Sequence, residues 1–182
     1  MKEISLNILD IAENSVKAKA KNINISILET NDYLIIEILD DGTGMTDEIL
    51  QNVTDPFCTT RTTRNVGLGI PLLKLSAEQT GGNVEITSKH FSKYPDNHGT
   101  KTVATFFKNH IDMTPLGDII STISTLIHCN PDIDFVFSHK ISNKEVTLNT
   151  KELRNVLGPV PLNNTEVNIW IKEYLSEQYK VS

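Results

Sequence analysis

The sequence contains little cysteine and no long apolar run, and each scarcity excludes a class of protein. Its two cysteines, Cys58 and Cys129, lie far apart, so we expect neither a disulfide framework nor a structural zinc site. No segment is long and apolar enough to cross a bilayer, and the N-terminus lacks the apolar stretch of a signal peptide. Reduced thiols and the absence of a targeting segment predict a cytoplasmic protein with no membrane partner.

Positive charge is also in short supply. The 182 residues include 23 Asp plus Glu against 17 Lys plus Arg, which gives a formal net charge of −6. Nucleic acids and anionic membranes attract positively charged surfaces, so neither is expected as a partner. The length suits one compact domain, or a core domain with a small appendage.

The first part of the chain alternates helical and strand-like patterns. Apolar residues recur at helical spacing near the N-terminus, and period-two alternation follows in two pairs of segments. These patterns predict helices over 3–19 and 70–80, strands over 22–28, 33–39, 83–88 and 101–107, and a loop-rich stretch over 40–66. Strand pairs separated by helices predict an α/β fold, a two-layer α+β sandwich whose mixed sheet has helices on one face.

The rest of the chain has patterns of its own. Residues 112–116 resemble a boundary, so we predict one domain over 1–109 and a small α/β region over 112–182. The second region is predicted to contain helices over 117–127, 150–157 and 165–179, with a hairpin over 134–139 and 145–148. Trp170 and Tyr174 fall on the last helix, where core packing is the favoured interpretation and a partner or dimer surface the alternative.

Seven of the nine glycines lie between Gly42 and Gly99, in clusters that border predicted strands and helices. None belongs to a P-loop, because no glycine is followed by Lys and then Ser or Thr, and none belongs to a Gly-x-Gly-x-x-Gly dinucleotide fingerprint. A nucleotide site in this chain must therefore be of another kind.

Three polar residues share one face of the first helix. Asp10, Asn14 and Lys17 are spaced i, i+4 and i+7. An asparagine oxygen suits Mg²⁺, a hard cation that also binds phosphates, and a lysine is a point-charge partner for phosphate oxygens. A solvated helix face is the plainer interpretation of the same spacing.

A carboxylate and two glycines follow the second predicted strand. Asp40 ends an apolar run and precedes Gly42 and Gly44. Glycine lets the backbone approach a ligand closely, and a carboxylate accepts a hydrogen bond from an amine such as that of adenine. A plain Asp-Gly turn is the alternative.

Taken in order, five segments resemble the motifs of the GHKL ATPase superfamily, which includes gyrase, heat-shock chaperones, histidine kinases and MutL. Residues 10–18 resemble its N-box, 40–45 its Asp-x-Gly-x-Gly box, 55–61 the kinase F-box and lid, 67–70 its second glycine box, and 99–100 the short closing motif. The resemblance covers about residues 4–107. It implies a Bergerat-type fold with ATP and Mg²⁺ as cofactors.

The resemblance also assigns roles to single residues. It implies that Asp40 selects adenine, that Asp41 faces elsewhere, that Asn14 holds Mg²⁺, and that Asp10 and Arg61 act in catalysis. Other nucleotide contacts are expected from Lys17, Gly42, Gly44, Met45, Phe57, Thr60, Arg64, Gly67, Leu68, Gly69 and Thr100. Arg61 and Arg64 would neutralise phosphate charge, and Gly67 and Gly69 open a helix whose N-terminal amides suit an anion.

Two functions remain open at this point. The kinase-like F-box predicts phosphoryl transfer from ATP to a separate protein, because the chain starts at the N-box with no phosphoacceptor helices before it. The alternative is an ATP-switched binding module with slow hydrolysis, in which Asp10 orients water.

His110 begins a segment that resembles a phosphoacceptor box but has Ile111 in place of the acidic residue, so a linker is favoured. A homodimer is not excluded, and the C-terminal region resembles tails of kinase-like ATPases encoded with iron-only hydrogenases.

Overall fold

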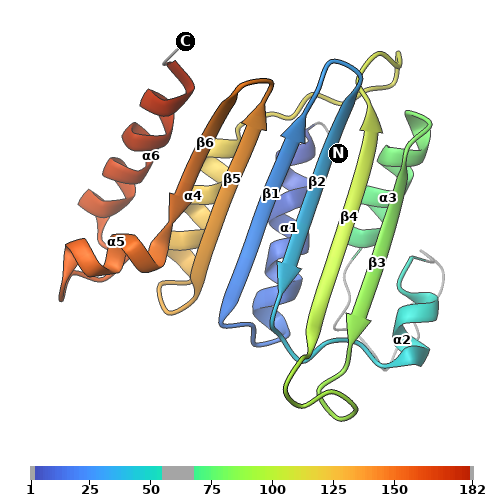
Figure 1. The fold of residues 1–182 in the computed structure, drawn as a ribbon, viewed down its shortest axis with the longest axis horizontal. Helices are drawn as coiled ribbons and strands as arrows, with labels where there is room; N and C mark the ends of the chain where they lie inside the picture. Colours follow the sequence, from blue (N-terminus) through green and yellow to red (C-terminus); the bar gives the residue numbers. More distant parts are fainter. Residues whose placement is uncertain (1–2, 55–67, 181–182) are drawn as a thin grey trace.

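In a computed structural model that describes residues 3–54 and 68–180, the described chain forms a six-stranded sheet with helices against one face (Figure 1). The strands are β1 Asn22–Glu29, β2 Tyr33–Asp40, β3 Asn83–Lys89, β4 Gly99–Phe107, β5 Asp134–Ile141 and β6 Lys144–Asn149. The helices are α1 Ile4–Lys17, α2 Asp47–Asn52, α3 Gly69–Gln79, α4 Ile119–Cys129, α5 Thr150–Leu157 and α6 Thr165–Lys180. The predicted two-layer α/β architecture with a mixed sheet is confirmed.

Hydrophobic periodicity explains the central elements. On α1 the isoleucines at 4, 8 and 11 are buried, and β1 buries every second residue through Ile23, Ile25 and Ile27. Burial of each such side chain contributes roughly 1.5–3 kcal/mol. The patterns that predicted these elements are therefore also the patterns that build the core.

The sheet order is β3-β4-β2-β1-β5-β6. Neighbouring strands are antiparallel except β1 and β5, which run parallel from the pair Asn22 and Asp134 to the pair Glu29 and Ile141. The parallel pair needs a long crossover, and the segment with β2, β3, β4 and α4 supplies it. The C-terminal region therefore continues the same sheet as the N-terminal region.

Helices α1, α3 and α4 lie behind the sheet in Figure 1, and α6 lies at its outer end beside β6. One cluster of buried side chains runs through both regions, from Phe106 on β4 through Ile8 on α1 to Phe137 on β5 and Ile171 on α6. Among the described residues no helix is long and apolar enough to span a membrane.

Two local expectations are wrong. The stretch predicted to be loop contains α2, which begins after Thr46, whose hydroxyl accepts a hydrogen bond from the Ile49 amide. A helix of six residues without a buried face leaves no periodic signal. Trp170 and Tyr174 do not pack in the core, because 45% and 37% of their surfaces are exposed. Val167, Ile171 and Leu175 fill the buried positions of α6 instead.

Candidate nucleotide site

The predicted site residues within the described chain gather at one end of the sheet. Strand β2 ends and β4 begins there, at the lower edge of Figure 1, where the C-terminal end of α1 also lies. Asp40 on β2 pairs with Thr100 on β4, and the Thr43 amide donates to the carbonyl oxygen of Ala18 at the end of α1. The fold therefore brings together the motifs at 10–18, 40–45 and 99–100, and Gly69 of a fourth motif lies against Asp10.

Asp40 is the buried carboxylate of this end, with 8% of its surface exposed. Its Oδ2 accepts a hydrogen bond from the Ser15 hydroxyl at 2.6 Å, and its Oδ1 accepts from the amides of Gly42 at 2.9 Å and Thr100 at 3.2 Å. Two carboxylate oxygens have about four acceptor sites. Asp40 is thus held in one orientation and can still accept a hydrogen bond from a bound amine.

Glycines let the surrounding backbone close around Asp40. A Cβ on Gly44 would lie 2.0 Å from the carbonyl oxygen of Lys89, and a Cβ on Gly99 would lie 2.0 Å from the carbonyl oxygen of Asp40. Both residues also have positive φ, 69° and 132°. No other residue type fits these two positions without moving the backbone. Gly42 is close-packed too, since its Cβ would meet Ala18 at 2.9 Å.

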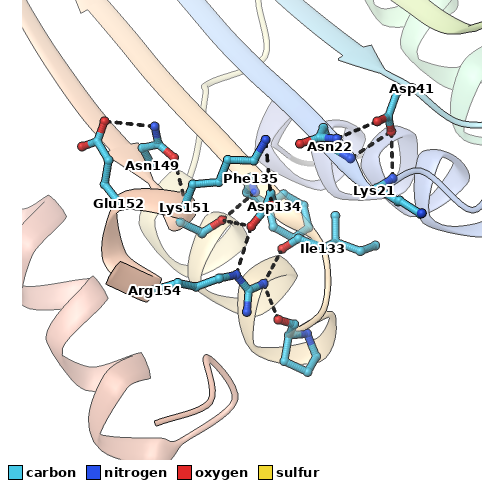
Figure 2. Close-up of polar contacts among 12 residues, drawn as sticks. Lys21, Asn22, Asp41, Ile133, Asp134, Phe135, Asn149, Lys151, Glu152 and Arg154 are labelled. Atoms are coloured by element: carbon cyan, nitrogen blue, oxygen red, sulfur yellow. Dashed lines mark hydrogen bonds and ion pairs between the residues drawn. The ribbon is translucent and has the colours of Figure 1, made fainter. Parts of the chain in front are cut away.

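Asp41 points away from Asp40 and binds the start of β1. Its carboxylate accepts hydrogen bonds from the amides of Lys21 at 2.7 Å and Asn22 at 2.9 Å, and from the Asn22 side chain at 2.6 Å (Figure 2). Burial opposes ionisation, but the hydrogen bonds from Asn22 and Lys21 outweigh it and lower the pKa of Asp41. The two adjacent aspartates therefore have separate roles, and Asp41 is structural.

Asp10 lies where α1 meets the first residue of α3. A Cβ on Gly69 would be 2.9 Å from the Cβ of Asp10 and 3.6 Å from its Oδ2, so Gly69 permits this close approach. Burial, and then the nearby charge of Glu13, raise the pKa of Asp10, while Lys17 lowers it. A carboxylate of raised pKa beside a helix N-terminus is chemically suited to act on a bound phosphate group or its water.

Asn14 lies one turn after Asp10 on α1 and directly before Ser15, which binds Asp40. It is half-buried, and its amide nitrogen is enclosed without a hydrogen-bond partner among the described residues. Among the described residues no hydrogen bond engages its amide oxygen, which is available to a metal ion. Lys17, one turn further on, is exposed and close enough to Asp10 to lower its pKa. These residues fit a bound Mg²⁺ and polyphosphate.

Sequence reasoning missed three residues of this end. Ser15 lies on the buried face of α1 and donates to Asp40, and a serine among isoleucines is the signal in the sequence that could have indicated it. Ser88 receives a hydrogen bond from the Met45 amide at 2.7 Å and lies 2.8 Å from the Thr100 hydroxyl. His98 donates from Nδ1 to the Gly42 carbonyl at 2.6 Å, and no spacing pattern pointed to it.

The other predicted contacts lie at the margin of the site or outside the described residues. Leu68 precedes α3 and is 57% exposed, and Met45 packs against the core. Five predicted site residues lie outside the described residues, namely Phe57, Thr60, Arg61, Arg64 and Gly67.

His110 lies at the opposite end of the sheet from Asp40. It follows β4, whose Phe107 pairs with Tyr33 while Thr100 pairs with Asp40. Seven residues of strand separate the two ends, about 23 Å at 3.3 Å per residue. The His110 Nδ1 accepts from the Asp112 amide at 3.1 Å and lies 3.6 Å from its carboxylate.

Comparison with known proteins identifies the N-terminal region. Residues 2–110 match the family described as histidine kinase-, DNA gyrase B- and HSP90-like ATPase. The chain is similar to the sensor protein KdpD of Clostridium acetobutylicum, with 32% identity over 94 residues, and to sporulation kinase C of Bacillus subtilis, with 29% over 91 residues. Each match covers 49% of this chain, which spans 10% and 20% of those two proteins.

Solved structures extend the likeness across the sheet. The N-terminal domain of a DNA repair protein superposes with a TM-score of 0.62 at 14% identity, covering 87% of this chain and 58% of that one. The MutL ATPase domain of Aquifex aeolicus, complexed with ADP, superposes with a TM-score of 0.55 at 15% identity, covering 100% and 70%. These similarities show a shared fold that includes the C-terminal region.

Proposed function

Because the chain belongs to the histidine kinase-, DNA gyrase B- and HSP90-like ATPase family, we propose that it transfers the γ-phosphoryl group of Mg-ATP to a separate protein. Family membership supports ATP binding, as does the ADP bound to the related MutL domain. The single observation that carries the proposal is the buried, oriented carboxylate of Asp40 beside Gly42, Gly44 and Gly99. In this site the adenine amine would donate to Asp40.

The phosphate end of the site would lie along α1 toward Asp10. Asn14 would hold Mg²⁺ through its amide oxygen, and Lys17 would neutralise phosphate charge. The chemistry that Mg²⁺ would supply there is positive charge that stabilises the transferring phosphoryl group. Gly69 and the start of α3 would present backbone amides to the same phosphates. The roles of Arg61 and Arg64 stay predictions from the sequence.

Asp10 decides between a protein acceptor and water. Its carboxylate is one methylene shorter than that of a glutamate, the other carboxylate that serves as a general base. Its raised pKa makes it a better proton acceptor when ionised, but the shorter reach disfavours direct contact with water. We expect slow hydrolysis and faster transfer to a protein acceptor.

Radiolabel transfer tests the proposal. The chain is incubated with [γ-³²P]ATP and a lysate fraction depleted of other kinases, and labelled proteins are separated. Label on a second protein, absent with Asp40→Asn and retained with Asp41→Asn, supports a kinase, and its acid lability separates histidine from serine. Phosphate release without any labelled protein contradicts transfer.

A second candidate function is an ATP-switched binding module. The curated kinases match about half of this chain, whereas the MutL structure matches all of it, including β5, β6 and α4 to α6. In that case ATP would change the affinity for a partner, and slow hydrolysis would reset it. ATP-dependent capture of a partner without labelled protein favours the switch.

Asp10 variants separate the two functions further. Asp10→Glu restores the longer side chain and is expected to raise ATP hydrolysis about tenfold or more, whereas Asp10→Asn abolishes hydrolysis and leaves ATP binding intact. A raised pKa also predicts that hydrolysis by the wild type declines as pH falls toward that pKa. Hydrolysis that is equal in all three proteins would remove Asp10 from the mechanism.

The His110 alternative has a direct test. About 23 Å of strand between Asp40 and the end of β4 disfavours transfer within one chain. His110→Ala is expected to leave any self-labelling unaltered, with Ser92→Ala as a surface control. Loss of label in His110→Ala alone would make His110 the acceptor, supplied in trans by a second copy.

A further inference from the structure

Helix α6 has a buried face and an aromatic flank. Val167, Ile171 and Leu175 are buried, with at most 5% of their surfaces exposed. Trp170 and Tyr174 lie one turn apart on the neighbouring flank, with 45% and 37% exposed. Leaving two large aromatic surfaces in water is costly, since each can bury 150–250 Å². Core packing therefore does not account for these residues.

The two rings are arranged as one platform. Their centroids are 4.8 Å apart and their planes are inclined by 14°, which is a stacked pair. The i, i+4 spacing on a helix brings the side chains together, so the pair needs no other contact to form. A stacked indole and phenol present flat π-faces, the surfaces that attract a cation.

Three carboxylates lie along one side of this platform, away from the buried face of α6. Glu166 and Glu173 lie four residues before and three residues after Trp170, and Glu177 lies three residues after Tyr174. All three are exposed, and helix geometry places them next to the rings. Lys172 lies on the opposite flank, where its charge acts on Asp118 at the start of α4. This flank of α6 therefore combines aromatic faces with three carboxylates, and its lysine, Lys180, lies at the C-terminal end of the helix, three residues beyond Glu177.

We propose that the aromatic flank of α6, defined by Trp170, Tyr174, Glu166, Glu173 and Glu177, docks a basic segment of a partner protein. An arginine or lysine of that segment would stack on Trp170 or Tyr174, and neighbouring basic residues would pair with the glutamates. Charge complementarity selects this occupant, because the rim is acidic and the chain has a net charge of −6. An anionic membrane is disfavoured for the same reason.

The flank lies far from the nucleotide site. Strand order puts β6 and α6 at one end of the sheet and β3 at the other, as Figure 1 shows. Docking there would hold a partner without blocking Asp40 or Asn14. The inference does not rest on the proposed function, and it predicts binding that is the same with and without ATP.

Trp170 supplies its own reporter, because it is the only tryptophan of the chain. An acetylated, amidated peptide of six alternating arginines and serines is titrated into the full chain while tryptophan fluorescence is recorded. We expect a saturable change that weakens as salt rises from 50 to 300 mM. A peptide with glutamate in place of arginine should give no change.

Labelled peptide and anisotropy then extend the test to variants. Trp170→Ala is expected to weaken binding about two- to fivefold, and Trp170→Ala with Tyr174→Ala about tenfold. The triple variant Glu166→Gln, Glu173→Gln, Glu177→Gln is expected to weaken binding about fivefold and to flatten the salt dependence. Its matched control changes three exposed glutamates elsewhere, Glu48, Glu85 and Glu145, to glutamine.

The control variant distinguishes binding at the aromatic flank from a general electrostatic attraction of the basic peptide to an acidic protein. If the control triple weakens binding as much as the rim triple, only net charge matters and the proposal is overturned. If the wild type self-associates in sedimentation and Trp170→Ala does not, a second copy is the occupant and the proposal is likewise overturned. Failure of ATP binding in the same proteins would leave this result unchanged, because Trp170 lies outside the nucleotide site.

Discussion

The nucleotide site and the C-terminal region of the sheet are built from different interactions. At the nucleotide end, Asp40 is fixed by three donors, and Gly44 and Gly99 sit where a Cβ would meet carbonyl oxygen at 2.0 Å. In the C-terminal region, at one lateral edge of the sheet, β5 and β6 are held by buried apolar residues such as Phe137 and by capped helices. Individual hydrogen bonds and close backbone contacts therefore define the nucleotide site, whereas apolar packing and helix caps define the C-terminal region.

The comparisons with known proteins also differ between these two regions. Sequence similarity to the sensor kinases covers about half of the chain, and the family match covers residues 2–110. Fold similarity to the MutL domain covers all of it at 15% identity. Packing tolerates many apolar combinations, whereas a buried carboxylate or a positive-φ glycine tolerates few substitutes. The residues that match the family, 2–110, include those that carry the residue-specific chemistry.

The largest expected effect comes from Asp40. Asp40→Asn removes the charge that the three donors orient, and ATP affinity should fall at least about 100-fold, or about 2.7 kcal/mol. Isothermal titration calorimetry with Mg-ATP measures the change. Asp41→Asn alters the adjacent carboxylate and should leave the affinity within about twofold. Equal losses in the two variants would contradict the separate roles of the two aspartates.

Asp41→Asn should instead affect folding. Asp41 accepts three hydrogen bonds and has a lowered pKa, so its contribution is full above the unfolded value near 3.9 and is lost as pH falls through the lower folded value. The variant should unfold with a free energy lower by about 1–2 kcal/mol at pH 7, allowing for solvent screening. Urea titrations at pH 7 and pH 3 measure both effects, and the difference between proteins should shrink at pH 3.

Substitutions at two glycines, one in each region, allow a direct comparison of the nucleotide site with the C-terminal region. Gly44 and Gly158 have φ of 69° and 60°, but a Cβ on Gly44 would meet Lys89 backbone whereas a Cβ on Gly158 meets nothing within 4 Å. Gly158→Ala should cost only backbone strain, about 1–3 kcal/mol, and should leave ATP binding unchanged. Gly44→Ala should cost more and weaken ATP binding at least about tenfold. Similar binding by both variants would show that the loop at Gly44 does not shape the site.

Buried hydroxyls give a smaller contrast. Ser15→Ala leaves Asp40 Oδ2 without its donor and should weaken ATP binding about tenfold, since a hydrogen bond to a charged group contributes about 1.5–3 kcal/mol. Thr150 is fully buried in the C-terminal region, and its hydroxyl accepts a hydrogen bond from the Phe135 amide at 2.8 Å. Thr150→Val should lower thermal stability without changing ATP affinity. A Ser15→Ala protein that binds ATP normally would show that Asp40 needs no positioning from α1.

Much of this fold could be predicted from the sequence, because the strands alternate and the long helices have apolar faces. Asp40, Asn14 and Asp10 could be proposed as site residues because each falls at a strand end or on a helix face with motif spacing. Ser15, Ser88 and His98 could not, because their roles depend on contacts between residues far apart in sequence, such as the 56 positions between His98 and Gly42. The same holds for Trp170 and Tyr174, whose exposure depends on where α6 packs.

The smallest effect concerns a buried histidine at the C-terminal end. His139, 2% exposed, lies with Nδ1 2.7 Å from the Tyr179 hydroxyl and Nε2 3.3 Å from Glu29. Burial lowers the pKa of His139, and the charge of Lys108 adds to this, against the opposing effect of Glu29. Unfolded chain therefore binds more protons, and stability should fall as pH drops below about 6.5. Tyr179→Phe should cost about 1 kcal/mol and leave ATP binding unchanged.

His139→Gln tests the assignment of this pH effect. The variant should lose the decline in stability between about pH 6.5 and pH 5, measured by urea titration. A decline that persists in the variant would assign the effect to another histidine.

Calorimetry of ATP binding with and without Mg²⁺, on wild type and Asn14→Ala, tests the central claim most directly. We expect the wild type to bind ATP at least about tenfold more weakly when EDTA removes Mg²⁺, and Asn14→Ala to bind weakly whether or not EDTA is present. Binding by Asn14→Ala that equals the wild type and keeps its full dependence on Mg²⁺ would contradict the account, as would a wild type that gives no heat of binding.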